Sequence, residues 1–457
     1  AAELEEGGVH ELNLLRSGRF VKTTQSPLGE LVELYHTRVG KAVRDGWTPE
    51  ESARHHLSLA RAMERERWDD PEALMMHYLS GGEQDRAGEL AMGAARQASE
   101  TLAFDRAANL YSTALELGQW DLATAEDLKS RLADTLVYAG RGEKAARVYL
   151  ELAQGADEAT SIELRRKAAE QLITNGYIDE GRVLLIEVLR RVDLKLPGSY
   201  RSAVFGHYMH RACLRWNGLV FTDTDEAQIA PADLHRIDAC WLTALSMSFV
   251  DPVLGMYFHE RNLLYSLKAG EQYRVLRAFT MELAFMVQMG DYDWNVWSKL
   301  LTRCKALANH VNLAHGHALV FMAEGMSAYL EGRYKNAYRL LRQAERTIVE
   351  LCPGVTFELA QCRLFALRSL MYVGELKQVG LEHPKLVNEA TECGNLLLSS
   401  SLRSDIFVLL LLAKDAPDKA RSNLASARAQ WSRAGAHFQH FFEIRGQVYL
   451  ALYEDRN

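Results

Sequence analysis

Apolar residues recur every three or four positions along most of this chain, which is the spacing of an amphipathic helix. In Ala103–Leu117 this spacing places two small residues, Ala107 and Ala114, on one stripe with the aromatic Tyr111. Small residues let a neighbouring helix approach closely, and the aromatic ring fills the space beside them. The segment is therefore predicted to be one helix of a helix hairpin.

The same small and large positions return downstream. Ala145 and Tyr149 repeat Ala107 and Tyr111, and Gly181 and Leu185 repeat them once more. The two steps, about 38 and then about 36 residues, are close to the period of tetratricopeptide-type hairpins, about 34 residues. We therefore predict a first tetratricopeptide series over residues 85–198, with the hairpins Asp85–Ser99 with Leu102–Leu117, Leu128–Ala139 with Gly142–Ala153, and Ile162–Asn175 with Ile178–Val192.

A second series with a longer period is predicted over residues 236–457. Its inward positions are Gly255, Val296, Ala337, Val379 and Ala420, which follow one another at steps of about 41 residues. The expected helices are Arg236–Phe249, Pro252–Ala269, Tyr273–Met289, Tyr292–Ala308, Leu313–Leu330, Tyr334–Leu351, Leu359–Val373, Leu376–Cys393, Leu396–Ala413, Ala416–Gly435 and His437–Tyr453.

Residues 199–235 interrupt the period. Tyr200–Trp216 is predicted to be a helix that carries Arg201, Arg211 and Arg215 and no acidic residue, followed by the loop Asn217–Pro231. We expect this break to be a place where the repeat array bends or meets a partner.

The N-terminal part of the chain, before the repeats, has a different pattern. A helix ending at Leu12–Arg16 and a short hairpin up to Ser26 and Pro27 are typical of the end of a winged-helix domain, here residues 1–30. Residues 31–84 are expected to be linking helices, of which the first is Leu31–Val43.

Composition supports a helical chain. Hydrophobic residues make up 48% of it, and its nine prolines are few for 457 residues. The predicted fold class is all-α, a right-handed superhelical solenoid of tetratricopeptide-like hairpins with a short winged-helix remnant at the N-terminus. The concave wall of such a solenoid is lined by the first helix of each hairpin and offers a groove for a partner.

The net charge and the cysteines indicate which partners and which cellular compartment to expect. The net charge of −7 is mild, so neither nucleic acid nor membrane is an expected partner. No apolar run reaches about 18 residues. The six cysteines are spread singly and are typical of a reducing compartment, so we expect a cytoplasmic protein; they are Cys213, Cys240, Cys304, Cys352, Cys362 and Cys393. Because the chain begins without methionine, we expect it to be a piece of a longer protein.

Catalytic motifs are absent from the sequence. Neither GxxxxGK[ST], GxGxxG, GxSxG, HExxH, HRD nor DFG occurs. His207, His210 and Cys213 share a predicted helix at a spacing that spreads them over about 120°, which is too wide for one metal ion. We therefore expect no catalytic residue, no metal and no cofactor in this chain.

Aromatic and charged residues of the middle repeats are the candidates for partner binding. Trp241, Arg274, Arg277 and Glu282 lie on first helices and are predicted to face the groove, where tryptophan and arginine are favoured anchors. Arg211 and Arg215 of the basic helix are further candidates. The alternative interpretation is that the tryptophans fill the wider repeats and the arginines pair with neighbouring glutamates.

Several longer stretches resemble one protein family. They include LYHTRVGKAV (34–43), HHLSLARAME (55–64), DDPEALMMHYLSGGEQDRAGELAMGAARQ (69–97), GYIDEGRVLLIEVLRRVDLKLP (176–197), RIDACWLTALSMSFVDPVLGMYFHERNLLYSLKAGEQYRVLRAFTMELAF (236–285), GVTFELAQCRLFALRSLMYVGEL (354–376) and QWSRAGAHFQHFF (430–442). They are similar to the tetratricopeptide region of large bacterial signalling proteins that also carry a serine/threonine kinase domain and a STAND-type AAA ATPase.

The resemblance implies a role. In that family the helical region is the sensor and autoinhibitor of the nucleotide switch, and residues 1–30 would close its winged-helix domain. This chain lacks the kinase and Walker motifs, so neither activity is expected of it. Its partner would be a protein, a peptide or a small effector in the groove, and an ATPase module if the chain is part of a longer protein. The alternative is a stand-alone scaffold that holds a client peptide without switching.

Overall fold

The computed structural model describes residues 8–26, 29–66, 68, 70–248, 251–288, 293–432 and 437–455. It divides into two compact units, one up to Thr135 and one from Leu136, so that the boundary falls inside helix α7 (Leu122–Tyr138). Each unit is considered by itself below. None of the helices in the described ranges combines the length and hydropathy that crossing a bilayer requires.

The first unit contains a strand pair followed by helices. Its elements are α1 (Gly8–Ser17), β1 (Val21–Ser26), β2 (Gly29–Leu34), α2 (Thr37–Asp45), α3 (Pro49–Arg65), α4 (Pro71–Ser80), α5 (Gln84–Glu100), α6 (Phe104–Leu117) and the larger part of α7.

The strand pair corrects two expectations of this region. A helix does precede it, but the hairpin expected up to Ser26 and Pro27 is wrong, because Val21–Ser26 form one strand, β1, which pairs antiparallel with β2, with Val21 opposite Leu34 and Lys22 opposite Glu33. The expected helix Leu31–Val43 is wrong, because its first residues form β2 and the helix begins only at Thr37. The Lys22–Glu33 ion pair, at 3.0 Å, helps to hold these residues in the sheet. The winged-helix origin of the segment stays a prediction, and residues 1–7 of it lie outside the described residues.

Helices α5 and α6 form the hairpin predicted from the Ala103–Leu117 pattern. Ala107, Tyr111 and Ala114 are buried, as the stripe requires. Gly88 of α5 lies so close to the end of α6 that a Cβ there would be 2.8 Å from the backbone nitrogen of Gly118. The small residues therefore do admit a close helix contact.

The second unit consists of helices. They are α8 (Gly142–Gly155), α9 (Glu158–Thr174), α10 (Ile178–Arg191), α11 (Tyr200–Asn217), η1 (Glu226–Gln228), α12 (Pro231–Met247), α13 (Pro252–Ala269), α14 (Gln272–Gln288), α15 (Trp294–Val311), α16 (Ala314–Leu330), α17 (Tyr334–Leu351), α18 (Thr356–Val373), α19 (Leu376–Glu392), α20 (Leu396–Arg403), η2 (Asp405–Phe407), α21 (Val408–Leu412), α22 (Pro417–Gln430) and α23 (Phe438–Tyr453).

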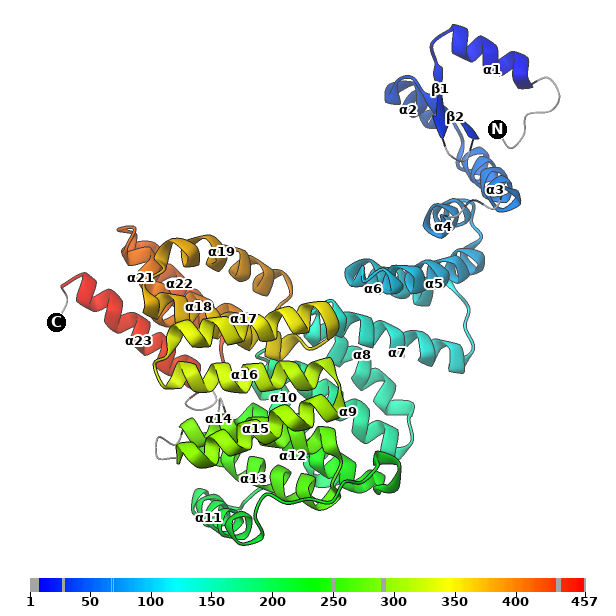
Figure 1. Cartoon of the computed structure of the whole chain (residues 1–457). Coiled ribbons are helices and arrows are strands. Elements are labelled where there is room, and N and C mark those ends of the chain that lie inside the picture. Colours follow the sequence, from blue (N-terminus) through cyan, green and yellow to red (C-terminus); the bar gives the residue numbers. More distant parts are fainter. Residues whose placement is uncertain are drawn as a thin grey trace. The chain divides into compact units, whose positions relative to one another are not determined.

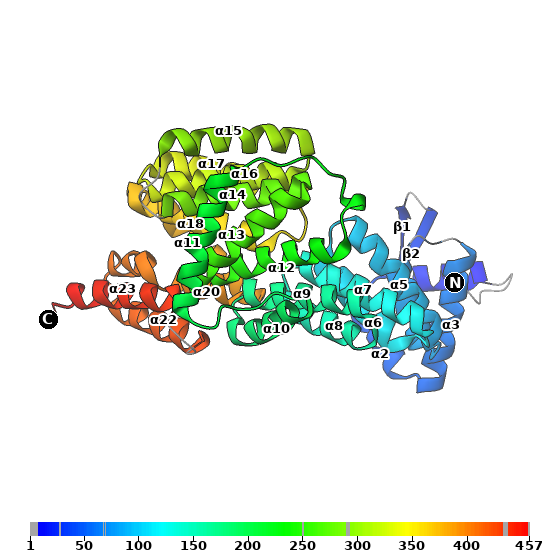
Figure 2. The same ribbon diagram turned by 90° about the horizontal axis from the view of Figure 1, so that it is seen from below.

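These helices stack as successive antiparallel hairpins (Figure 1). The predicted inward positions Gly255, Ala337, Val379 and Ala420 are all buried. Seen from below, α15 lies on the outside of the stack and α14 within it (Figure 2). The architecture is the predicted all-α solenoid of tetratricopeptide-like hairpins.

The register predicted for α15 is wrong. Val296 is 50% exposed, whereas Trp297, Leu301 and Cys304 are buried one position further along. A tryptophan therefore stands where most other repeats have a small residue, and the small-to-large pattern could not reveal it.

A second departure is the break in the expected helix Leu396–Ala413. The chain leaves α20 at Ser404, and Asp405 adopts φ +60, in the left-handed region that aspartate tolerates better than most residues. The carboxylate of Asp405 is completely buried and binds Arg368 of α18 and Arg445 of α23. The break thus places a counter-ion beside two arginines that lie far away in the sequence.

The second unit closes on itself. The backbone oxygen of Asn175, at the α9–α10 turn, accepts hydrogen bonds from the backbone nitrogens of Leu396 and Leu397, at 2.8 and 3.3 Å. Asp179 of α10 accepts a hydrogen bond from Ser432, at 2.7 Å. Turns that lie far apart in the sequence therefore meet, and the inner helices between them surround a common space.

Candidate functional site

An apolar cavity of about 340 Å³ lies on the inner side of the hairpins of the second unit. It is bounded by α12, α14, α16 and α18, which are the first helices of four successive hairpins, and by the last helix, α23. Its apolar wall is formed by Trp241, Leu245, Met281, Ala284, Phe285, Leu319, Met322, Ala323, Met326, Leu330, Phe357, Phe365, Phe438, Phe441 and Phe442. Cavities of this size and composition are typical of small-molecule sites.

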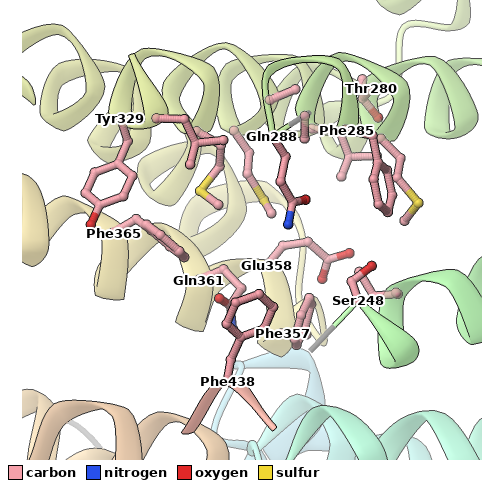
Figure 3. Close-up of a pocket in the computed structure, with 18 of the residues that line it drawn as sticks. Ser248, Thr280, Phe285, Gln288, Tyr329, Phe357, Glu358, Gln361, Phe365 and Phe438 are labelled. Carbon is pink, nitrogen blue, oxygen red and sulfur yellow. The ribbon is translucent and has the colours of Figure 1, made fainter. Parts of the chain in front are cut away.

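One face of α18 provides several of the polar groups of this cavity. Glu358, Gln361, Phe365 and Arg368 follow one another at three- and four-residue steps, so they share one side of the helix. Figure 3 shows Glu358 on α18 and Gln288 on α14 directed toward the same open space, with Phe357 and Phe438 beside Glu358.

Glu358 ends a line of polar contacts that crosses the inner helices. Its Oε1 lies 3.7 Å from His315 Nε2 on α16, and His315 Nδ1 shares a 2.7 Å hydrogen bond with the Tyr273 hydroxyl on α14. Burial by itself would raise the pKa of Glu358, but the nearby His315 and the positive charge of Arg277 lower it below its usual value. Glu358 is therefore ionised at neutral pH.

The line continues to α12 through a cluster of paired charges. Asp238 binds Arg274, with Oδ2 at 2.9 Å from Nη2, and also binds Arg277. The Arg277 guanidinium carbon lies 4.7 Å from the centre of the Trp241 ring, a cation–π distance. Burial raises the pKa of the Asp238 carboxyl, but the two arginines outweigh this and lower it well below its usual range. Arg274 also pairs with Glu271 at 3.1 Å, so two carboxylates face the two guanidiniums of the cluster.

The end of the cavity near α23 is closed by arginines and rings. Arg368 is almost fully buried, and its guanidinium lies 4.2 Å from the centre of the Phe442 ring and binds Asp405 at 3.1 Å. Arg445 of α23 binds the same carboxylate and faces Phe441. Asp405 therefore ties α18 and α23 together at this end.

The six residues predicted as partner anchors are distributed over four places. Trp241 lines the cavity. Arg274 and Arg277 do not line it and form ion pairs with Asp238, whereas the alternative interpretation expected glutamates, of which Glu271 does pair with Arg274. Glu282 and Arg211 lie in a separate buried cluster, described next, and Arg215 is exposed on α11. A role of any of them in partner binding stays a prediction.

The separate cluster fixes α11 to the stack, and we call it the α11 anchor. Arg211 Nε lies 2.7 Å from Glu260 Oε1, Arg211 Nη1 lies 2.5 Å from Glu282, and His259 lies 2.7 Å from Glu282. His207 Nδ1 lies 2.7 Å from Glu260. Burial, reinforced by the charge of Glu282 and opposed by Arg211, raises the pKa of Glu260 to about 8. Two carboxylates here share one arginine, so the one without a full counter-charge keeps its proton near neutral pH.

The histidines of this cluster do not form a metal site. His207 and His210 approach Glu260, whereas Cys213 is exposed and accepts a hydrogen bond from Asn217 at 3.3 Å. Across the described ranges, no group of three His, Cys, Asp or Glu side chains is placed to hold a metal ion.

The outer face of α11 carries an apolar stripe. Phe205, Tyr208, Met209 and Trp216 follow one another at helical spacing and are exposed, Trp216 to 91%. Contiguous exposed aromatic residues of this kind mark interaction surfaces in soluble proteins.

Sequence reasoning missed the polar residues of the cavity. The expected helix began at Leu359 and so left Glu358 in a loop, whereas α18 begins at Thr356 and places Glu358 in its first turn. The spacing of Glu358, Gln361, Phe365 and Arg368 is a signal that could have found this face.

Comparison with known proteins does not assign this chain to a family. No protein-family model matches the sequence, and no curated protein matches it. Among solved structures, the chain is similar to a signal transduction ATPase with numerous domains (STAND) protein with a tetratricopeptide repeat sensor from Pyrococcus horikoshii, with 12% identity and a TM-score of 0.34 over 97% of this chain and 61% of that one.

A second similar structure is the Cut9–Hcn1 hetero-tetramer of the APC/C, with 10% identity and a TM-score of 0.19 over 92% of this chain and 86% of that one. The chain spans about three fifths of the length of the STAND protein. Because both TM-scores are below 0.5, the function of this chain has to be argued from its own residues.

Proposed function

We propose that this chain is a regulatory sensor module that binds a small effector, or an apolar group of a partner protein, in the cavity between α12, α14, α16, α18 and α23. The observation that carries the proposal is the cavity itself, about 340 Å³ with walls of phenylalanine and methionine. Methionine side chains adapt to ligands of different shape, and the few polar groups can orient what is bound.

The proposal extends to control of a nucleotide switch. Its support is the sequence resemblance to the sensor region of STAND-type ATPase and kinase signalling proteins. A ligand shifts such a switch only if it binds one conformational state more tightly than the other. Five helices contribute to the cavity, so a ligand that draws them together would change the curvature of the hairpin stack and provide that difference.

Binding to the cavity is tested with Nile red, an uncharged fluorescent dye. The wild-type chain should bind it with increased emission, and Met322→Trp, which fills the cavity, should abolish this. Val349→Trp adds the same indole on the exposed surface of α17 and is the matched control. Equal binding by all three proteins would place the dye elsewhere and refute the site.

The proposed control of a nucleotide switch is tested in the longer protein that would contain this chain. The gene should encode a P-loop ATPase upstream of Ala1, and Met322→Trp in that protein should change the effector dependence of ATP hydrolysis while the nucleotide site is intact. A gene that encodes no such module would refute the control of a nucleotide switch.

A second candidate function is a scaffold that holds a client protein without switching. The exposed aromatic stripe on α11 favours it, because it offers a docking surface outside the cavity. Amide hydrogen exchange of the chain, measured with and without its bound partner, distinguishes the scaffold from the sensor. Protection confined to α11 would favour the scaffold, and protection of α14, α16 and α18 would favour the sensor.

A further inference from the structure

The cavity presents one carboxylate to whatever occupies it. The Glu358 side chain is 15% exposed, and Figure 3 shows it directed into the open space of the cavity. It lies in the first turn of α18, where the helix dipole favours a negative charge. Its ion-pair partner, His315 Nε2, is 3.7 Å away, which is longer than a charge-assisted hydrogen bond of about 2.7–2.9 Å. The contact with His315 is therefore long, and the carboxylate can accept a closer hydrogen bond from a ligand.

The positive charges around the cavity are committed to other partners. Arg274 and Arg277 do not line it and are paired with Asp238. Arg368 lines it and is paired with Asp405 at 3.1 Å, its guanidinium lies against the Phe442 ring, and its Nε and Nη2 atoms make no hydrogen bond to the described residues. Arg445 binds Asp405. Among the described residues that line the cavity, Glu358 is thus the carboxylate that can meet a cationic ligand.

The surroundings of Glu358 suit a positively charged nitrogen. Phe357 and Phe438 lie beside the carboxylate (Figure 3), and aromatic faces attract cations. Gln361 is 4% exposed and its side-chain amide has no hydrogen-bond partner among the described residues, so its oxygen is available to an N–H donor. The remaining wall is apolar and fits a hydrocarbon body.

We propose that the cavity selects small molecules that combine an apolar body with one protonated amine, and that Glu358 is the counter-ion of that amine. This inference rests on the proposed function, because it names the class of effector that the same cavity would take. An anionic ligand of the same body would place a second negative charge beside Glu358 in an apolar environment, which is costly.

The test uses three probes with the same apolar body: phenylbutylamine, phenylbutanol and phenylbutanoate. Their affinities for the whole chain are measured by isothermal titration calorimetry at neutral pH. The amine should bind about 10–100-fold more tightly than the alcohol, which corresponds to one hydrogen bond to a charged group. The carboxylate should bind most weakly.

Two substitutions assign the preference to Glu358. Glu358→Gln should remove the difference between the amine and the alcohol and leave the affinity for the alcohol unchanged. Glu358→Asp, which keeps the charge, should retain the preference for the amine. Glu350→Gln, at an exposed position on α17, is the matched control and should behave as wild type. The folding of each variant is checked by circular dichroism. If Glu358→Gln folds poorly, the preference for the amine in Glu358→Asp still decides the test.

The outcomes separate this inference from the proposed function. If no probe and no Nile red bind, the cavity is not a ligand site and both proposals fail. If the three probes bind equally, or the carboxylate binds most tightly, the cavity stands and the selection of amines is overturned. An amine preference that survives Glu358→Gln would also overturn it.

Discussion

Glu260 has no side-chain exposure and should make the stability of the second unit depend on pH. Its pKa is about 8 in the folded chain and near 4.5 when unfolded, so between these values the folded state holds a proton that the unfolded state has lost. Stability therefore falls as pH rises through this window. His210, whose pKa burial lowers to about 4, acts in the opposite sense and only below its usual value of 6.5.

Between pH 6.5 and 8 the effect of Glu260 should thus be separable. We expect urea unfolding to show a loss of about 1–2 kcal/mol across this interval in wild type. Glu260→Gln should lose most of this decline, whereas the exposed control Glu350→Gln should keep it. A Glu260→Gln variant with the full wild-type decline would contradict the protonated state of the α11 anchor.

Asp238 offers a second prediction at the level of single residues. Asp238→Ala leaves the buried guanidinium of Arg277 without its counter-ion and removes the strongest partner of Arg274, and we expect a loss of about 3 kcal/mol in the free energy of unfolding. Asp233→Ala, on the same helix, breaks an exposed pair with Arg236 and should cost less than about 1 kcal/mol. Equal losses in the two variants, measured by urea unfolding, would show that the Asp238 cluster is not a buried ion pair.

Residue identity alone could indicate charged and aromatic candidates but not their partners. Trp241 does reach the cavity, because a first helix faces inward. Arg274 and Arg277 face inward as well, yet their charges are met by Asp238 from the preceding hairpin, a contact that no local pattern reveals. Glu358 was missed because helix ends are set by capping and packing, and an earlier helix start moved it from a loop into the wall of the cavity.

The elements themselves were largely predictable, since each buried stripe repeats with helical spacing. The exceptions have local physical causes. The pattern of residues 31–34 is compatible with either a helix or a strand, and pairing with β1 stabilises the strand. The run 396–413 is apolar over most of its length, and only the buried pairing of Asp405 with two arginines reveals why the helix breaks there.

Gly270, which ends α13, provides a test at the scale of elements. It has φ +79, and a Cβ on it would overlap the carbonyl oxygen of Thr222 in the loop before α12. Gly332, in the α16–α17 turn with φ +76, has no atom within 4 Å of the same position. Gly332→Ala should cost only the left-handed strain, about 1 kcal/mol.

Gly270→Ala should cost about 3 kcal/mol or more, because it also displaces the loop and its hydrogen bond from Thr224 to the Gly270 oxygen. The measurement is the midpoint of urea unfolding for both variants. Similar midpoints would mean that the loop over residues 217–231 is not held against α13.

At the scale of the second unit, the α9–α10 turn is hydrogen-bonded to the start of α20. Gly176 permits it: its φ is +93, and a Cβ there would lie 2.6 Å from the Leu397 backbone nitrogen. Repeat arrays are stabilised mainly by contacts between neighbouring repeats. The contact between these distant hairpins is not needed for that stability, and one added methyl group can disrupt it. Gly176→Ala should therefore open the turn without unfolding the individual hairpins.

Opening this turn should also weaken ligand binding, because α20 leads through Asp405 to α23, whose phenylalanines line the cavity opposite α12 and α14. We expect Gly176→Ala to bind Nile red more weakly than wild type and to increase amide exchange in α20 and α23. Gly374→Ala, at the α18–α19 turn with φ +90 and no atom within 4 Å of the new Cβ, introduces the same backbone strain without the clash and should bind the dye normally. If both variants bound the dye equally, the cavity would depend on the inner helices alone, and closure of the array would have no part in recognition.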